Sequence, residues 1–163
     1  MQKPLKILVI MTKKIGDTLI CTPLLSAIKK EHSNAEIDFL AKYPASEILE
    51  RNPDINQIYI INKTPWLKLI SEIRKKKYDF IIDLYPTEKT ALICALSKCK
   101  NRIRGYFLKP KLYHSIYNIQ PDYYTTNQTY APNRHIKFLE GILFKEVKTF
   151  PKMTLILPPI YTI

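Results

Sequence analysis

The stretch that decides the fold reads Lys6-Ile-Leu-Val-Ile-Met11, Thr12-Lys-Lys-Ile-Gly-Asp-Thr18, Leu19-Ile-Cys-Thr-Pro-Leu-Leu-Ser-Ala-Ile28 and, after a short gap, Ala35-Glu-Ile-Asp-Phe-Leu40. The near-continuous apolar run over 6–12 predicts a strand that is covered on both faces. Apolar residues at helical spacing over 20–28 predict an amphipathic helix, and 35–40 predicts a second strand. Ligands of open α/β sheets bind at the carboxyl ends of the strands, and the Gly16-Asp17 pair falls there.

The first residue of this helix is open to two interpretations. Asp17 could be the N-cap, which is a position that aspartate favours. Alternatively, Thr22 and Pro23 could be the N-cap and the first helical residue, which suits proline better than a helix interior. A kinked helix would accommodate both.

The alternation of strands and helices continues along the chain. We expect a short helix over 44–51, a strand over 57–61, a helix opened by Thr64-Pro65 with a basic last turn over 74–77, a strand over 79–84, a helix from Thr87 to about Ser97 with Leu92, Ala95 and Leu96 facing inward, and a strand over 102–106. This order predicts an α/β fold, namely a Rossmann-like parallel sheet with right-handed crossovers and helices on both faces.

Regularity is weaker after residue 106. The segment 107–133 is rich in tyrosine, proline and asparagine, and it predicts a long functional loop. Asn133 is expected to cap a helix over 135–144. Residues 155–157 are expected to form a last strand.

Composition places the chain among globular domains. It has 163 residues, of which 46% are apolar and 25% charged, and no apolar run is long enough to span a bilayer. No signal-peptide pattern is present, and the three cysteines lack zinc-type spacing. They are expected to be reduced residues of the core in a cytoplasmic protein.

The net charge of +12 is unevenly placed along the chain. No acidic residue lies between Glu88 and Asp122, and this stretch carries Lys89, Lys98, Lys100, Arg102, Arg104, Lys109 and Lys111. Such a surface favours an anionic partner: nucleic acid, an acidic membrane leaflet or a phosphorylated substrate. Nucleic acid ranks lowest, because no RNP, KH or helix-turn-helix pattern accompanies the charge.

The familiar nucleotide-binding loops are missing. The chain has only three glycines, with no GxGxxG after the first strand and no P-loop pattern, which argues against a dinucleotide-binding or P-loop domain. The candidate residues lie elsewhere, and each has a plainer alternative. Asp17 could accept a proton from a substrate hydroxyl or only cap a helix. Lys89, beside Thr87 and Thr90, could bind an anion or lie on a solvated helix face. His135 could be a ligand or a surface residue.

Taken in order, several segments resemble the N-terminal half of the family-9 glycosyltransferases, the ADP-heptose:lipopolysaccharide heptosyltransferases. They are Lys6-Ile-Leu-Val-Ile10, Ile15-Gly-Asp17, Thr22-Pro-Leu-Leu25, Ala35-Glu-Ile-Asp-Phe-Leu40, Asn52-Pro-Asp54, Tyr78-Asp-Phe-Ile-Ile-Asp-Leu84, Lys89-Thr-Ala91, Arg102-Ile-Arg-Gly-Tyr106 and His135 with Leu139. The order and spacing of these segments over about 150 residues carry the resemblance.

The resemblance implies one half of a two-domain GT-B enzyme that transfers heptose with inversion from ADP-heptose to a phosphorylated lipid-A-linked core sugar. The resemblance also implies that this transfer needs no metal and no cofactor besides the donor. Asp17 would be the catalytic base. The acceptor-binding residues would be Lys13, Lys14, Gly16, Thr18, Thr87, Lys89, Arg104 and His135. Two positions depart from the pattern: Met11 stands where a basic residue is common, and Pro86 where a small turn residue is usual.

The resemblance also predicts the domain organisation. Residues 1–157 are expected to form the acceptor-side domain and 158–163 the start of a linker, while the C-terminal donor-binding half is absent from this sequence. We therefore expect the chain to be inactive by itself and to need a further domain or chain. Its anionic glycolipid acceptor implies peripheral contact with the cytoplasmic leaflet of the inner membrane. The rival hypothesis is a non-catalytic basic module that binds anionic glycolipid or RNA.

Overall fold

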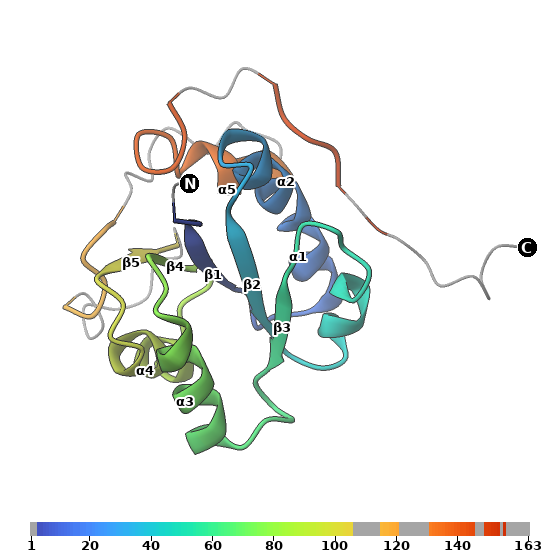
Figure 1. The fold of residues 1–163 in the computed structure, drawn as a ribbon. Coiled ribbons are helices and arrows are strands. Elements are labelled where there is room, and N and C mark those ends of the chain that lie inside the picture. Colours follow the sequence, from blue (N-terminus) through green and yellow to red (C-terminus); the bar gives the residue numbers. More distant parts are fainter. Residues whose placement is uncertain (1–2, 106–114, 121–130, 146–148, 154, 156–163) are drawn as a thin grey trace, which may run out of the picture.

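The computed structural model describes residues 3–105, 115–120, 131–145, 149–153 and 155. Within these ranges lies a sheet of five parallel strands: β1 (Lys6–Ile10), β2 (Glu36–Ala41), β3 (Gln57–Ile60), β4 (Phe80–Asp83) and β5 (Asn101–Arg104). The strand order is β3-β2-β1-β4-β5, and every neighbouring pair is parallel. The predicted Rossmann-like sheet is confirmed (Figure 1).

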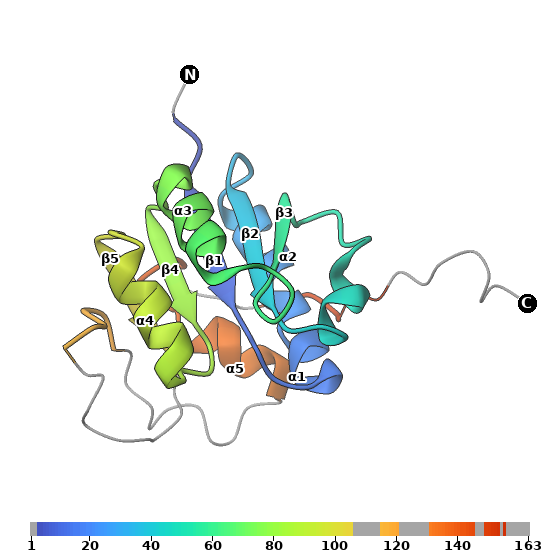
Figure 2. The ribbon, with the colours of Figure 1, turned by 90° about the horizontal axis from the view of Figure 1, so that it is seen from below.

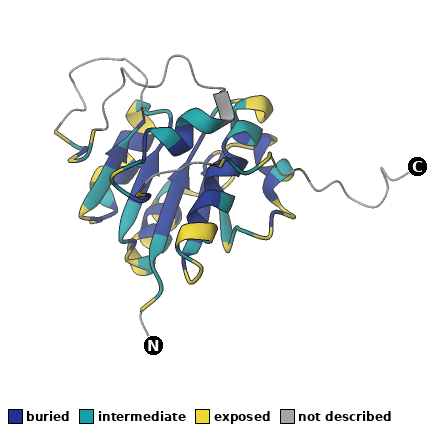
Figure 3. Cartoon of the chain, turned by 90° about the horizontal axis from the view of Figure 1, so that it is seen from above, coloured by how far each residue is buried: buried dark blue, intermediate teal, exposed yellow. Residues whose placement is uncertain are grey.

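Helices cover both faces of this sheet, as predicted. They are α1 (Ile15–Ile20), α2 (Thr22–Glu31), the short 3-10 helix η1 (Ala45–Leu49), α3 (Trp66–Lys76), α4 (Glu88–Leu96) and α5 (Ala131–Lys137). One face packs against α2 and α5, and the other packs against α3 and α4 (Figures 1 and 2). Side chains of β1 alternate between these two cores, with Val9 in the first and Leu8 in the second. Figure 3 shows the buried strands at the centre.

The helix after β1 is two successive helices that meet at Cys21. Lys14 is the N-cap of α1 and Cys21 that of α2, so neither proposed cap, Asp17 or Thr22, is confirmed. The break between the two helices at Cys21 takes the place of the kinked helix that was considered. Pro23 lies in the first turn of α2, where its missing amide hydrogen breaks no helical hydrogen bond.

The predicted inward face of α4 is wrong for Leu92 and Ala95, whereas Leu96 packs against the core. The core residues of this helix are Ala91, Ile93 and Cys94, whereas Leu92 is 46% exposed and Leu96 is only half-buried. Ala95 is exposed as well. The helix is apolar on nearly all sides, so apolar spacing cannot indicate which side faces the sheet.

The end of the described chain also differs from prediction. Helix α5 ends at Lys137, well short of residue 144, and Asn133 lies inside the helix and does not cap it. Turns follow, with Gly141 at a φ of 79° that suits glycine. Leu155 is in no strand, while 156–157 and the expected linker 158–163 lie outside the described residues.

Candidate active site at the switch point of the sheet

The sheet order reverses between β1 and β4, and this position defines the crevice where open α/β sheets bind ligands. The loops that follow these two strands contact each other there. The Lys13 ammonium, from the loop after β1, lies 3.5 Å from the centre of the Tyr85 ring, from the loop after β4. This cation–π contact holds one of the predicted basic residues at the mouth of the crevice. Tyr85 was not predicted; an aromatic residue directly after a buried strand was the available signal.

Asp17 lies in the first turn of α1, directly after this loop. It is half-buried, and its carboxylate makes no hydrogen bond or ion pair with any residue in the described ranges. Its backbone carbonyl accepts a hydrogen bond from the Cys21 thiol at 3.1 Å, which fixes the main chain without using the side chain. The carboxylate therefore has the exposure and the spare hydrogen-bonding capacity that a general base needs.

Gly16 leaves open space beside Asp17. Apart from the adjacent residues and the backbone of its own helix, a methyl group placed on its α-carbon would meet no atom within 4 Å, and the residue is exposed. The backbone here is helical and does not require glycine for its conformation. The absence of a side chain at position 16 therefore leaves room beside the carboxylate, as a bulky ligand would require.

His135, from α5, approaches the same region from the other end of the chain. Burial, together with the charge of the neighbouring Arg134, lowers the pKa of its imidazole to about 4, although the Asp17 carboxylate acts in the opposite direction. The ring is only 4% exposed and is neutral at neutral pH. The fold thus brings Asp17 and His135 close enough for the charge of one to act on the other.

The other predicted site residues are spread more widely. Lys14 is exposed at the start of α1, but Thr18 is fully buried and its hydroxyl donates to the Lys14 carbonyl at 3.2 Å. Thr87 is the N-cap of α4, paired with Thr90 in a capping box. Thr18 and Thr87 thus have clear structural roles.

Two predicted cations lie at different distances from the crevice. Arg104 ends β5, next to β4, at the carboxyl edge of the sheet. The exposed Lys89 lies with its ammonium 5.9 Å from the centre of the Trp66 ring, on the α3 side of the molecule. Arg104 is therefore near the crevice, and Lys89 extends toward the outer face of α3 and α4.

A buried carboxyl group lies at the carboxyl end of β4, next to the crevice. Asp83, the last residue of β4, is fully buried and accepts a hydrogen bond from the Tyr117 hydroxyl at 2.7 Å. Burial raises the pKa of this carboxyl to about 6, although Thr90, Tyr117 and the Tyr85 amide partly offset the effect. The contact between Asp83 and Tyr117 was not predicted from the sequence. The only local signal for it was an acidic residue at the end of an apolar strand.

The loop predicted over 107–133 is anchored here in its described part, 115–120. Tyr117 is buried on Asp83, and the Ile119 carbonyl accepts the Arg104 amide at 3.0 Å. This segment continues the sheet beyond β5 through a parallel bridge between Ile103 and Ile119. The remaining residues of the predicted loop up to 130 lie outside the described ranges.

Gly105 brings β5 close to β4 at the same edge. Its amide donates to the Asp83 carbonyl at 2.6 Å, and a β-carbon at this position would lie 2.2 Å from the Leu84 carbonyl oxygen. Only glycine permits this approach. The contact therefore fixes Arg104, the preceding residue, next to the loop that follows β4.

In the described ranges, no three His, Cys, Asp or Glu side chains come together in a group that could hold a metal ion. None of the helices there has the length and apolar character to cross a membrane. All three cysteines are buried and unpaired, which confirms their predicted place in the core.

Comparison with curated proteins gives relatives of one kind. The chain is 34% identical over 97 residues to lipopolysaccharide heptosyltransferase 3 of Escherichia coli, a match that covers 54% of this chain and 28% of that protein. The protein of the same name from strain K12 is 36% identical over 87 residues, covering 48% and 25%. The predicted resemblance to the heptosyltransferases of glycosyltransferase family 9 is confirmed. No family model matches the sequence.

Solved heptosyltransferases share the fold of this chain. The E. coli ADP-heptose lps heptosyltransferase II superposes with a TM-score of 0.77 at 21% identity, over 95% of this chain and 47% of that one. E. coli heptosyltransferase WaaC with ADP superposes with a TM-score of 0.71 at 18% identity, over 89% of this chain and 49% of that one. A family 9 glycosyl transferase from Veillonella parvula superposes with a TM-score of 0.63 at 19% identity, over 82% of this chain and 40% of that one. The chain thus spans about half the length of these GT-B structures, and about a quarter of the curated relatives is matched in sequence.

Proposed function

We propose that this chain is the acceptor-side half of a heptosyltransferase-like glycosyltransferase of lipopolysaccharide core biosynthesis. The observation that carries the proposal is the half-buried Asp17 carboxylate, which has no hydrogen-bond or ion-pair partner among the described residues and follows the uncrowded Gly16 at the switch point of the sheet. The named relatives supply the reaction class, since they are heptosyltransferases. The acceptor would be a phosphorylated, lipid-A-linked core sugar, and the donor ADP-heptose.

In the proposed reaction, Asp17 accepts the proton of the acceptor hydroxyl as its oxygen attacks the anomeric carbon of the heptose. A new carbon–oxygen bond forms, the bond to the diphosphate breaks, and ADP departs with the electron pair. Attack from the face opposite the leaving group inverts the anomeric centre. Asp17 is then protonated and returns its proton to water. A general base in this position contributes a rate factor of about 10²–10⁴.

The neighbouring residues have supporting roles in this proposal. Lys13, held on the Tyr85 ring, and the exposed Lys14 place positive charge beside the acceptor phosphate. Arg104 lies at the same edge of the sheet. His135 is neutral at neutral pH, so it leaves the charge of Asp17 intact. Thr18 is omitted, because it is fully buried.

We further propose that transfer requires a donor-binding domain in addition to this chain. Stabilisation of the departing diphosphate is usually a large electrostatic contribution, and the sequence has no glycine-rich nucleotide loop to provide it. A turnover assay with ADP-heptose and core acceptor tests this: the 163-residue chain alone is expected to give no product, and measurable transfer by it would refute the requirement.

Asp17→Asn tests the assigned base in a two-domain enzyme made by joining the chain to the donor half of a family-9 enzyme. The rate is expected to fall by about 10²–10⁴-fold. Unfolding temperature and acceptor affinity should be nearly unchanged, and Lys152→Ser is the control at an exposed position outside the loops after β1 and β4. An undiminished rate would remove Asp17 from the chemistry and favour a non-catalytic module. Salt-sensitive RNA binding would then point to the nucleic-acid alternative.

A further inference from the structure

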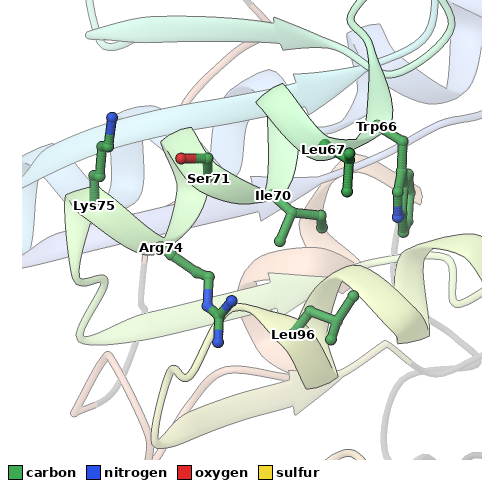
Figure 4. A pocket seen from close by; sticks show the side chains of 7 residues that line it. All are labelled: Trp66, Leu67, Ile70, Ser71, Arg74, Lys75 and Leu96. Atoms are coloured by element: carbon green, nitrogen blue, oxygen red, sulfur yellow. The ribbon is translucent and has the colours of Figure 1, made fainter.

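We propose that the groove between α3 and α4 is a docking surface for a membrane that displays anionic phospholipid headgroups. The groove has a volume of about 390 Å³ and is open to solvent. It is lined by Trp66, Leu67, Ile70, Ser71, Arg74 and Lys75 of α3 and by Leu96 of α4 (Figure 4). The proposal rests on the proposed function only in supposing a lipid-linked acceptor; the binding itself does not depend on the chemistry at Asp17.

The two helices that form the groove expose apolar side chains, Leu67 in its lining and Leu92 outside it. Leu67 is 83% exposed and Leu92 is 46% exposed, and both extend from the helices that form the groove. Leu92 lies one turn before Leu96 and so on the same side of α4. Helix α4 therefore has an apolar outer face in addition to the face that packs on the sheet. Such a helix is expected to contact a further apolar surface.

Basic residues surround these apolar side chains. Arg74 and Lys75 line the groove near the end of α3, and the Lys89 ammonium lies 5.9 Å from the Trp66 ring near its start. Figure 4 shows the Arg74 side chain extending toward Leu96, across the space between the helices. The long apolar stems of such side chains can lie against acyl chains while their charged ends reach phosphate groups.

Acidic residues oppose this charge only weakly. Glu72 of α3 pairs with Lys68 at 4.0 Å, and the exposed Glu88 begins α4. An apolar strip bordered by cations, with a tryptophan at one end, has the chemistry of a membrane interface. Because the cations complement anionic headgroups, we assign an anionic bilayer as the partner, and a second copy of this chain would bring like charges together.

The groove is also well placed for a lipid-linked substrate. Helices α3 and α4 follow β3 and β4, so their first residues lie at the carboxyl edge of the sheet, where α1 and Asp17 also begin. Trp66 and Lys89 belong to these first turns. A bilayer in contact with the groove would therefore meet the molecule beside the crevice. Its lipid-linked sugars could reach the crevice without leaving the membrane.

Trp66 permits a direct test because it is the only tryptophan in the chain. The full chain is mixed with phosphatidylcholine vesicles that contain about a third phosphatidylglycerol and no glycolipid. We expect a blue shift of the Trp66 emission, quenching by brominated acyl chains, and loss of both at high salt. Vesicle binding without quenching, or no binding, would overturn the proposal.

Paired variants show which residues carry the binding. Leu67→Ser with Leu92→Ser, and separately Arg74→Ser with Lys75→Ser, are each expected to weaken vesicle binding at least tenfold. The control Lys152→Ser with Met153→Ser removes similar exposed groups near the segment that contacts α2 through Thr149, and should bind as the wild type does. Equal loss in the control, or self-association abolished by the leucine variants, would overturn the assignment.

The two proposals can fail separately. Asp17→Asn should bind vesicles as tightly as the wild type, since these vesicles contain no acceptor. In the two-domain enzyme, the groove variants should lose vesicle binding but keep transfer to a water-soluble acceptor unchanged.

Discussion

At the scale of single residues, the proposed site depends on the absence of a side chain at Gly16. Gly16→Ala adds a methyl group that meets no atom within 4 Å apart from the adjacent residues and the backbone of its own helix, and the residue lies in α1. Since alanine favours helices, the variant is expected to be as stable as the wild type or up to about 1 kcal/mol more stable. Its acceptor affinity should nevertheless fall several-fold, because the methyl group occupies the space assigned to the sugar.

Calorimetric titration with a phosphorylated core oligosaccharide, together with thermal unfolding, checks this prediction. A larger side chain in Gly16→Val should deepen the loss of affinity. If both variants bind the oligosaccharide as the wild type does, the open space beside Asp17 is not the sugar site.

His135 predicts a dependence of stability on pH. Folding lowers the pKa of this histidine to about 4 from an ordinary value of 6.5, so the folded state resists its protonation. The contribution of the neutral ring is complete above pH 6.5 and is lost as the pH falls toward 4. The loss approaches about 3 kcal/mol, at about 1.4 kcal/mol per pH unit.

The measurement is the free energy of unfolding by urea, for the wild type and His135→Gln, at several pH values from 4 to 7.5. The stability advantage of the wild type should shrink as the pH falls. The comparison with the variant is needed because Asp83 acts in the opposite direction: its raised pKa, about 6, makes the folded state bind a proton more readily between pH 6 and 3.8. A constant difference between the two proteins would contradict the burial of a neutral His135.

Gly105 is the residue that allows β5 to lie close to the end of β4. In Gly105→Ala, the new methyl group would overlap the Leu84 carbonyl oxygen, so β5 must move away from β4. We expect a loss of about 1–3 kcal/mol in stability, as for other overpacked sites. Gly141→Asn, at a φ of 79° with free space around it, is the matched control and should cost much less. Equal losses in thermal unfolding would contradict the close approach.

At the scale of secondary-structure elements, a buried carboxylate joins β2 to α3. Asp38 of β2 is 1% exposed; it pairs with Lys76 of α3 at 3.1 Å and accepts a hydrogen bond from the Tyr78 hydroxyl. Asp38→Ala would remove the carboxylate that pairs with the partly buried Lys76 side chain and would leave the Tyr78 hydroxyl only its 3.3 Å hydrogen bond to the Tyr59 hydroxyl. We expect a loss of about 2–4 kcal/mol, since the Lys76 side chain keeps some contact with water.

Lys68→Ala provides the control for this ion pair, because it removes the more exposed Lys68–Glu72 pair, 4.0 Å long, on the same helix. Its cost should be below about 1 kcal/mol. Urea unfolding of both variants gives the comparison, and a difference of less than about 1 kcal/mol would show that the Asp38 network is not an important link between β2 and α3.

The elements also show where sequence reasoning succeeds. The run around β1 is almost entirely apolar, that of β4 is apolar up to Asp83, and β2 keeps apolar residues at most positions although it contains Glu36 and Asp38; the three strands were predicted to within about two residues. Helix α4 is apolar on nearly every side, and its buried side was therefore predicted wrongly for Leu92 and Ala95. Its orientation is decided by packing against β4 and α3, which spacing within the helix does not encode.

At the scale of the whole molecule, the site is assembled from distant parts of the chain. Asp17 and Gly16 could be predicted because they directly follow a recognisable strand. The approach of His135 to Asp17 and the burial of Tyr117 on Asp83 depend on the packing of late segments against early strands. Such contacts are not visible in local patterns, although the resemblance placed His135 in the site. The contact of Lys13 with Tyr85 likewise follows from strand order, which places β4 beside β1.

The central claim is that the carboxylate of Asp17 lies beside the bound acceptor sugar. A crystal structure of the chain with a phosphorylated core oligosaccharide tests it most directly. We predict a sugar hydroxyl within hydrogen-bonding reach of that carboxylate, about 2.6–3.2 Å, with the acceptor phosphate near Lys13 and Lys14. An oligosaccharide bound elsewhere on the molecule, with Asp17 in contact only with solvent, would contradict the account.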